Sequence, residues 1–315
     1  FARAKVRFPT FKTWREKHSD EVHAGLAPRM FRGPLLIVRK VPKIDGEVSR
    51  GLATWTSQDV VYSQSFLGLS AAWHPNANAV SRYLFVWLNS SVLRHYLLMC
   101  SADWGVERGT LLVDDLRSLP VPHPESLSEA QRAAFDECAA EMIATDHVDV
   151  ERCDGLVAEV FGLSGADLEC VRDTLAMSEP GRDSARAAQE APPAVVVEAF
   201  RARLEEILAP LLKYSGRTLR VRIAEQEAVS PWRVLLFCTR GDGGAPPREL
   251  VDGALALATR EGASRVVFVG GVRTATVAVG VFRQQRYWTL TQARSLALHL
   301  LGDVAVMDTL RGATK

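Results

Sequence analysis

The stretch from residue 178 to 193 most constrains what this chain can fold into, because its sequence S-E-P-G-R-D-S-A-R-A-A-Q-E-A-P-P contains no aromatic and no β-branched residue. Such a stretch cannot bury much apolar surface. The chain has 315 residues, which is more than one typical domain holds. We therefore predict a flexible linker here that separates two globular parts and allows them to move independently.

Composition places both parts among ordinary globular proteins. Hydrophobic residues make up 47% and charged residues 24% of the chain, unlike disordered or fibrous sequences. The longest apolar runs, such as 266–271 and 296–301, are too short to cross a bilayer, so we expect no membrane partner. The five cysteines are widely spaced and form no C-x-x-C pair, which favours a reducing, cytoplasmic compartment. The chain begins with Phe1 and shows no signal peptide, so we interpret it as an excised piece of a longer polypeptide.

Charge is unevenly distributed along the chain, although the formal net charge is only +1. Residues 1–122 hold 16 Lys and Arg against 10 Asp and Glu, residues 123–190 hold 5 against 16, and residues 191–315 hold 17 against 11. A basic block attracts polyanions, because each neutralised phosphate releases counterions. The two basic blocks therefore fit nucleic-acid binding, and an ordinary solvated surface is the alternative explanation of the same excess.

The first basic block has the pattern of a mixed α/β recognition domain. A Gly-Pro turn precedes an apolar run, and β-branched segments follow, so we predict strands at 31–41, 51–55 and 60–62. Apolar residues recur at helical spacing over 79–100, where Asn89-Ser-Ser interrupts the pattern and starts a second helix. Closely spaced prolines then end the block, because proline continues neither a helix nor a central strand. We therefore place the first domain at 1–124.

A helical connector and a small α+β domain are expected beyond this boundary. Acidic amphipathic segments from Ser128 onward predict three helices, which form a connector at 125–177. After the linker at 178–193, the element order α-β-β-α-β-β-α indicates a separate domain at 194–315. The predicted fold class of the whole chain is therefore α+β.

Known catalytic and metal-binding motifs are missing from the sequence. We find no G-x-G-x-x-G after a strand, no G-x-x-x-x-G-K-[ST], no G-x-S-x-G and no H-E-x-x-H. The glycine-rich stretch 241–244 lacks the lysine of a phosphate-binding loop, so a plain surface loop is favoured. The seven histidines are scattered, and Asp114-Asp115 has no third ligand nearby in the sequence. The sequence therefore predicts neither a catalytic site nor a metal site in this chain.

The order of several segments in the first half resembles one family. F-R-G-P-L-L-I-V-R-K at 31–40 is followed by Leu88-Asn-Ser in a helix and by the turn Leu119-Pro-Val-Pro. A helix that ends in Phe161-Gly-Leu, with an acidic helix start after it, continues the pattern. Over residues 28–176 these segments resemble the target-recognition region of amino-methylating DNA methyltransferases. This region is the specificity part of type IIG restriction-modification enzymes and of their phage-defence relatives.

The resemblance implies the DNA-recognition portion of an adenine-specific N6 methyltransferase, with or without an attached nuclease. Such an enzyme carries an Asn/Asp-Pro-Pro-Tyr/Phe motif and a glycine-rich loop for S-adenosylmethionine, and this chain has neither. We therefore expect S-adenosylmethionine on a catalytic domain or subunit outside this chain. That catalytic part and double-stranded DNA are the expected partners.

Basic, amide and aromatic residues of the first block are the candidate DNA contacts. Long cationic side chains reach phosphates, arginine also binds guanine O6 and N7 through two hydrogen bonds, and glutamine suits an adenine edge. A solvated or core position is the alternative for each residue, and for Trp104 it is a single buried ring that pins a helix-to-strand connection. The candidates are Arg32, Arg39, Lys40, Lys43, Arg50, Gln58, Trp104 and Arg108, with Trp55 and Tyr62 as additional stacking candidates.

A basic aromatic segment near the C-terminus offers a second nucleic-acid or partner contact, at Arg283, Arg286 and Trp288. The alternative for its aromatic residues is a hydrophobic staple at the start of the final helix.

Two functions from different classes are in competition. DNA recognition requires an affinity that falls steeply with salt and retains a sequence preference. A non-catalytic protein-interaction module of a defence complex requires neither. An enzyme with an unrecognised site, such as a nuclease, is a weaker third hypothesis, because two carboxylates and a lysine do not assemble in a nuclease-like order around any strand pair.

Overall fold

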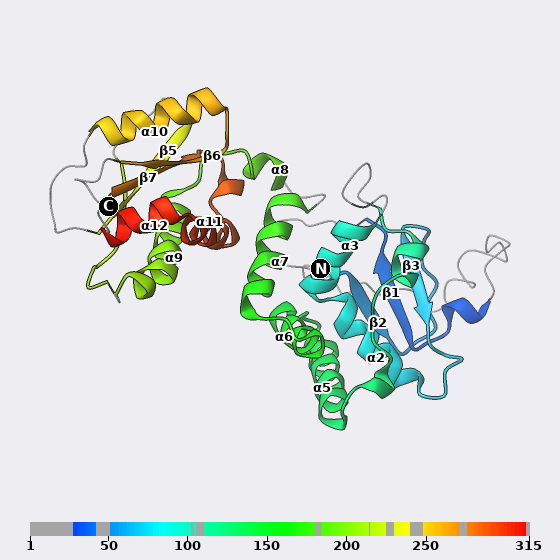
Figure 1. Cartoon of the computed structure of the whole chain (residues 1–315). Helices are drawn as coiled ribbons and strands as arrows, with labels where there is room; N and C mark the ends of the chain where they lie inside the picture. The colour runs from blue at the N-terminus through cyan, green and yellow to red at the C-terminus, as the bar shows by residue number, and fades with distance from the viewer. Residues whose placement is uncertain are drawn as a thin grey trace. The chain divides into compact units, whose positions relative to one another are not determined.

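The computed structural model describes residues 28–41, 51–101, 104, 110–179, 184–213, 215–224, 230–239, 248–270 and 276–312. The described residues form an α+β fold with two small antiparallel sheets, which confirms the predicted class. The chain divides into two compact units, unit 1 (residues 1–184) and unit 2 (residues 185–315), and each sheet belongs to one of them (Figure 1).

The sheet of unit 1 has three strands in the order β2-β1-β3, with both pairs antiparallel. Its central strand is β1 (Leu35–Arg39), between β2 (Ala53–Thr56) and β3 (Phe66–Ser70). Side chains of β1 alternate between two clusters, since Leu36 and Val38 join the main core of unit 1, and Leu35 and Ile37 join a smaller cluster. Because both faces are covered, β1 is an uninterrupted apolar run, as the sequence predicted.

The predicted strand at 60–62 is wrong. Only Val60 makes a strand-like contact there, and its backbone N–H donates to Phe31 O at 2.9 Å. The third strand is instead β3, whose Gly68 breaks the apolar pattern that would have identified it. Gly68 is required by packing, because a Cβ at this position would lie 2.2 Å from the Tyr62 hydroxyl oxygen.

The helices of unit 1 begin where the capping residues predict. Ser90 Oγ accepts from Leu93 N at 3.2 Å, and Ser128 and Ser164 each open a helix through a capping box. The elements are η1 (Pro28–Phe31), α2 (Ala77–Leu88), α3 (Ser91–Cys100), α4 (Val113–Arg117), η2 (Pro124–Ser126), α5 (Glu129–Thr145), α6 (Val150–Phe161) and α7 (Gly165–Ser178).

The helices of the predicted connector share one core with the sheet of unit 1. Phe135 on α5 stacks on Trp87 of α2 with 6.0 Å between ring centroids, and Tyr83 lies 5.0 Å from the same Phe135 ring. Cys138 and Val157 are buried in this core as well. The sequence analysis separated these helices from the sheet at residue 124, whereas the described residues on both sides of that position pack into one unit.

Unit 2 has a four-stranded antiparallel sheet in the order β4-β5-β7-β6. Helices α9, α11 and α12 pack on one face and α10 on the other (Figure 1). The predicted order α-β-β-α-β-β-α is confirmed, and α12 is an additional helix that the sequence analysis did not anticipate. The elements are α9 (Ala194–Lys213), β4 (Arg220–Ile223), β5 (Trp232–Cys238), α10 (Arg248–Glu261), β6 (Arg265–Val269), β7 (Thr276–Phe282), η3 (Gln285–Tyr287), α11 (Leu290–Gly302) and α12 (Val304–Arg311).

The predicted linker is anchored where the structure describes it. Glu179 is buried in unit 1, and a short helix, α8 (Ser184–Ala187), follows. Further on, Arg286 N donates to Ala188 O at 3.1 Å and Gln285 N donates to Glu190 O at 2.8 Å, which fixes this part of the chain to η3. Flexibility of the segment stays a prediction.

Candidate nucleic-acid interface

One end of the unit 1 sheet gathers exposed polar and aromatic side chains. Strand β1 begins at this end, and β2 and β3 finish here, because both run antiparallel to β1. The loops beyond these strand ends carry Arg32 and Gln58, both exposed, together with Trp73. We call Arg32, Gln58 and Trp73 the sheet rim.

Hydrogen bonds hold the rim loops against one another. Ser70 Oγ donates to Arg32 O at 2.7 Å, and Gly33 N donates to Asp59 Oδ1 at 2.9 Å. The loops approach so closely that a Cβ on Gly33 would lie 2.3 Å from Ser57 O, which only glycine avoids. The backbone positions that carry Arg32 and Gln58 are therefore fixed before any ligand arrives.

Trp73 is the most exposed large hydrophobic side chain among the described residues, with 81% of its surface accessible. Its indole N–H donates to Ser70 O at 3.0 Å, and its ring meets the edge of the His74 ring at a centroid distance of 5.8 Å. His74 is itself held, because its Nδ1 accepts from Asn76 N at 3.0 Å. The indole is thus oriented by its own turn while most of its surface faces solvent. The sequence analysis missed Trp73, whose signal was an isolated Trp in the polar loop S-A-A-W-H-P-N.

Arg39 and Lys40 lie at the opposite end of β1 from the rim. The backbone N–H of Arg39 donates to Leu52 O at 3.2 Å, and that of Lys40 donates to Ser65 O at 3.1 Å. At about 3.3 Å per residue, the strand alone is roughly 13 Å long, and the rim residues lie beyond its first residue, so this pair is farther than that from the rim. The structure therefore brings Arg32 and Gln58 together and places Arg39 and Lys40 apart from them.

Three of the predicted contacts, Lys43, Arg50 and Arg108, lie outside the described residues. Trp104 is fully buried in the core of unit 1. This position matches the alternative of a single buried ring that pins a connection, so Trp104 is left out of the candidate interface.

Trp55 and Tyr62, the additional stacking candidates, are engaged inside unit 1. The Trp55 indole N–H donates to Ser81 Oγ at 2.9 Å, and the Arg82 guanidinium carbon lies 5.6 Å from the centroid of the Trp55 ring. Tyr62 packs against Gly68, and burial raises the pKa of the Tyr62 hydroxyl. Both rings therefore stabilise the sheet in this structure.

The three C-terminal candidates also differ in exposure. Trp288 is buried, its ring lies 5.0 Å from Phe200, and its Nε1–H donates to Phe282 O at 2.8 Å, as the staple alternative expects. Arg283 is partly buried and donates from Nη1 to Ser230 O at 3.3 Å. Only Arg286 of the three is exposed.

The Leu-Asn-Ser segment of the family resemblance is structural. Asn89 is fully buried and joins the end of α2 to strand β2. Beside it, the Asp154 carboxylate on α6 accepts from Ser91 N at 2.6 Å, at the first residue of α3. Burial raises the pKa of Asp154, and the Ser91 hydrogen bonds oppose this rise.

Replacing Asp154 by asparagine is expected to remove a pH-dependent loss of stability. Because the folded-state pKa is raised, the folded protein binds more protons than the unfolded protein above about pH 4, the ordinary carboxyl pKa. The free energy of unfolding of wild-type unit 1 therefore falls as the pH rises through the folded-state pKa. Asparagine does not ionise, so this slope is absent. Urea unfolding of both proteins over a pH series measures it, and identical slopes would refute the assignment.

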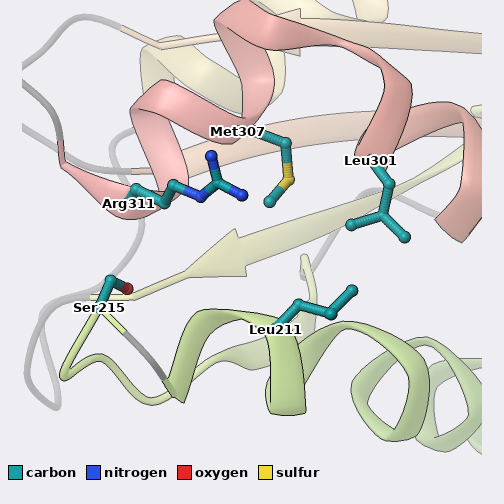
Figure 2. A pocket seen from close by; sticks show the side chains of 5 residues that line it. All are labelled: Leu211, Ser215, Leu301, Met307 and Arg311. Atoms are coloured by element: carbon teal, nitrogen blue, oxygen red, sulfur yellow. The ribbon is translucent and has the colours of Figure 1, made fainter.

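Unit 2 has an open pocket of about 520 Å³ between the end of α9 and the α11–α12 pair. Leu211, Leu301 and Met307 form its apolar lining, and Ser215 and Arg311 supply polar groups. Figure 2 shows the Arg311 guanidinium extending toward Met307, with Leu211 on the opposite wall. The Ser215 hydroxyl is already used, because it donates to the backbone oxygen of Leu212 at 2.6 Å.

A second pocket of about 270 Å³ lies against β4, an edge strand. Two of its lining residues complete the hydrogen bonding of that edge, since Val221 N donates to Glu205 Oε1 at 2.7 Å and Arg201 Nη1 donates to Val221 O at 3.4 Å. Arg201 also pairs with Glu205 at 2.8 Å. These side chains cover the strand edge and so block pairing with another strand.

No group of three or more His, Cys, Asp and Glu side chains converges on a common point within the described part of the chain. Among the helices that the structure describes, none combines the length and apolarity needed to cross a membrane. Comparisons of the chain with protein-family models, with curated proteins and with solved structures find no match in any of the three.

Proposed function

We propose that unit 1 recognises double-stranded DNA and delivers it to an adenine-methylating catalytic domain or subunit that binds S-adenosylmethionine. The observation that carries the proposal is the sheet rim, where a guanidinium, a carboxamide and an indole are presented on backbone that is already ordered. Groups that are ordered before binding lose less conformational freedom when the ligand arrives.

The three rim groups match the chemistry of a DNA groove. Arg32 suits phosphate or the O6 and N7 atoms of guanine, and Gln58 suits the N6 and N7 atoms of adenine. The Trp73 indole N–H is occupied by Ser70 O, so the ring offers an apolar wedge that packs on sugars or between base steps. Together these residues supply both positioning and base-reading contacts.

The cationic pair at the other end of β1, Arg39 and Lys40, supports the same proposal. Arg39 and Lys40 lie at and just beyond the far end of β1, which is itself roughly 13 Å long, so the pair and the rim are separated by more than the width of the major groove, about 12 Å. Long cationic side chains at the two ends of one strand can therefore contact phosphates at separate points along a duplex.

Methyl transfer itself belongs elsewhere in this proposal. The sequence has neither the Asn/Asp-Pro-Pro-Tyr/Phe motif nor the glycine-rich loop that S-adenosylmethionine requires in the family that it resembles. The residues of this chain do not fit that cofactor, so we assign methyl transfer to another domain or subunit.

A titration of the full chain with a randomised duplex pool at two salt concentrations tests the proposal. We expect a short enriched motif and an affinity that falls steeply with salt. Trp73→Ala is expected to weaken binding by roughly tenfold, since an aromatic contact to a base contributes about 1–3 kcal/mol. Arg32→Ala is expected to weaken binding and to relax the motif at one position.

Matched surface variants control for nonspecific effects. Met99→Ala removes another exposed apolar side chain, and Arg117→Ala removes an exposed arginine that is paired with Asp114. Neither variant is expected to change the affinity. The proposal is refuted if the chain does not bind DNA or binds it without sequence preference. It is also refuted if the control variants change the affinity as much as the rim variants do.

A protein-interaction module is the second candidate, and the apolar lining of the unit 2 pocket favours it. Leu211 is 42% exposed although it is a large hydrophobic residue. Such a surface suits a protein partner. The same titration separates the two candidates, because this module requires no salt-dependent affinity for DNA.

A further inference from the structure

Three sulfur atoms meet where α5 packs against α6. Cys138 and Met142 lie one helical turn apart on α5, and Cys153 lies across from them on α6. Cys153 Sγ is 3.7 Å from Met142 Sδ, and the neighbouring Cys153 lowers the pKa of the Cys138 thiol. All three side chains are buried, so the sulfur atoms are shielded from solvent.

We propose that Cys138, Met142 and Cys153 form a binding site for a monovalent soft metal ion, Cu(I). Thiolate and thioether sulfur are the ligands that Cu(I) prefers. An ion at the centre of three sulfurs with bonds of about 2.3 Å separates its ligands by about 4 Å, close to the 3.7 Å found here. The site therefore needs little rearrangement to take up the ion.

The ligand set favours Cu(I) over Zn²⁺. Structural zinc sites are almost always tetrahedral with four nitrogen, oxygen or thiolate ligands. This cluster offers two thiols and a thioether, a set that suits a three-coordinate monovalent ion better.

The site lies beside a charged side chain, Arg152, that is itself paired with two glutamates. On binding Cu(I), each cysteine thiol releases one proton, so the ion and two thiolates together carry one negative charge. Arg152 precedes Cys153 in the chain, and its positive charge acts on Cys138. The Arg152 guanidinium is held near by Glu137, at 3.4 Å, and by Glu141.

The turn between the two helices provides a route for the ion. His147 N donates to Met142 O at 3.3 Å, and Cys153 N donates to Asp149 O at 3.1 Å, so this turn starts near one proposed ligand and ends near another. We expect the ion to enter by local opening at this turn. The bound ion then joins α5 to α6 through metal–sulfur bonds.

Competition between the reduced full chain and a chromogenic Cu(I) chelator, without oxygen, tests the proposal. We expect one Cu(I) per chain, release of two protons, and an X-ray absorption spectrum with only sulfur neighbours. Cys153→Ala and Met142→Leu are expected to weaken binding at least tenfold, because even residues that only support a metal ligand contribute about that much. Met142→Leu conserves volume and keeps the test valid if Cys153→Ala fails to fold.

Cys100→Ser and Cys170→Ser are the matched controls, because each removes a thiol outside the cluster. These variants are expected to bind Cu(I) like the wild type. The proposal is overturned if the wild type takes no copper from the chelator, if Met142→Leu binds as tightly as the wild type, or if copper is lost with Cys100 or Cys170. Any of these outcomes would mean that the sulfur atoms serve only as apolar packing.

Discussion

Replacing Glu179 by alanine is expected to destabilise unit 1 by about 3–5 kcal/mol. Glu179 follows the last residue of α7, and its carboxylate pairs with Arg94 on α3. Arg94 Nε donates to Glu179 Oε1 at 2.9 Å, and both side chains are almost completely buried. Without the carboxylate, the buried guanidinium loses this ion pair and its hydrogen bonds to Glu179 at a site that water hardly reaches, and this loss is the main cost.

Hydrogen exchange measured by mass spectrometry checks this prediction. Peptides from α3 and α7 should exchange faster in Glu179→Ala at every denaturant concentration, while peptides from β7 in unit 2 serve as the internal reference. The double variant Arg94→Met/Glu179→Leu should recover most of the lost stability, because it replaces the charge pair by apolar packing of similar size. A double variant that is less stable than Glu179→Ala would show that the cost has another origin.

Replacing Asn89 by alanine is expected to destabilise unit 1 by about 2–6 kcal/mol. Asn89 Oδ1 accepts from Ala53 N at 3.1 Å, and Asn89 Nδ2 donates to Ala53 O at 3.2 Å and to Phe85 O at 2.8 Å. Strand β2 is an edge strand, so this one carboxamide takes the place of a neighbouring strand at Ala53. Alanine leaves both buried backbone groups of Ala53 without these bonds, at about 1–3 kcal/mol for each group.

Two comparison variants make the Asn89 prediction specific. Asn89→Asp keeps the size and one acceptor but cannot donate to Ala53 O or Phe85 O, so it should be destabilised as well. Asn78→Ala, at an exposed position on α2, should change the free energy of unfolding by less than about 0.5 kcal/mol. Urea unfolding of each variant, monitored through hydrogen exchange of the β2 amides, gives the comparison. Equal stability of Asn89→Ala and Asn78→Ala would contradict the structural role of Asn89.

Local sequence signals predicted the helices well. Ser90 and Ser128 cap helices that were expected to begin there, and Ser164 caps the next helix in the same way, because an N-cap residue bonds to backbone only a few positions away. Gly162 ends α6 with a φ of 65°, in the left-handed region that glycine tolerates. The sheet was harder to predict, since β3 pairs with β1 about thirty residues earlier in the chain and has a glycine at its centre.

The candidate interface was predicted only in part. The selection of basic, amide and aromatic residues in the first block included Arg32 and Gln58, which do lie together, but also Trp104, which is buried. Trp73 was overlooked because neither charge nor periodicity distinguishes an exposed Trp from a core Trp. Only the turn that holds its indole N–H to Ser70 O reveals that the ring faces solvent.

The sequence by itself determined the α+β class, the positions of the capped helices, the element order of unit 2 and the absence of known methyl-transfer motifs from the chain. These features depend on composition and on contacts between residues close in sequence. Tertiary structure decided that the helices after residue 124 share the core of unit 1, that Asn89 completes a strand edge, and which candidate side chains gather at the sheet rim. Each of these depends on packing and hydrogen bonds between distant segments, whose partners are chosen by burial and shape once the whole unit has folded.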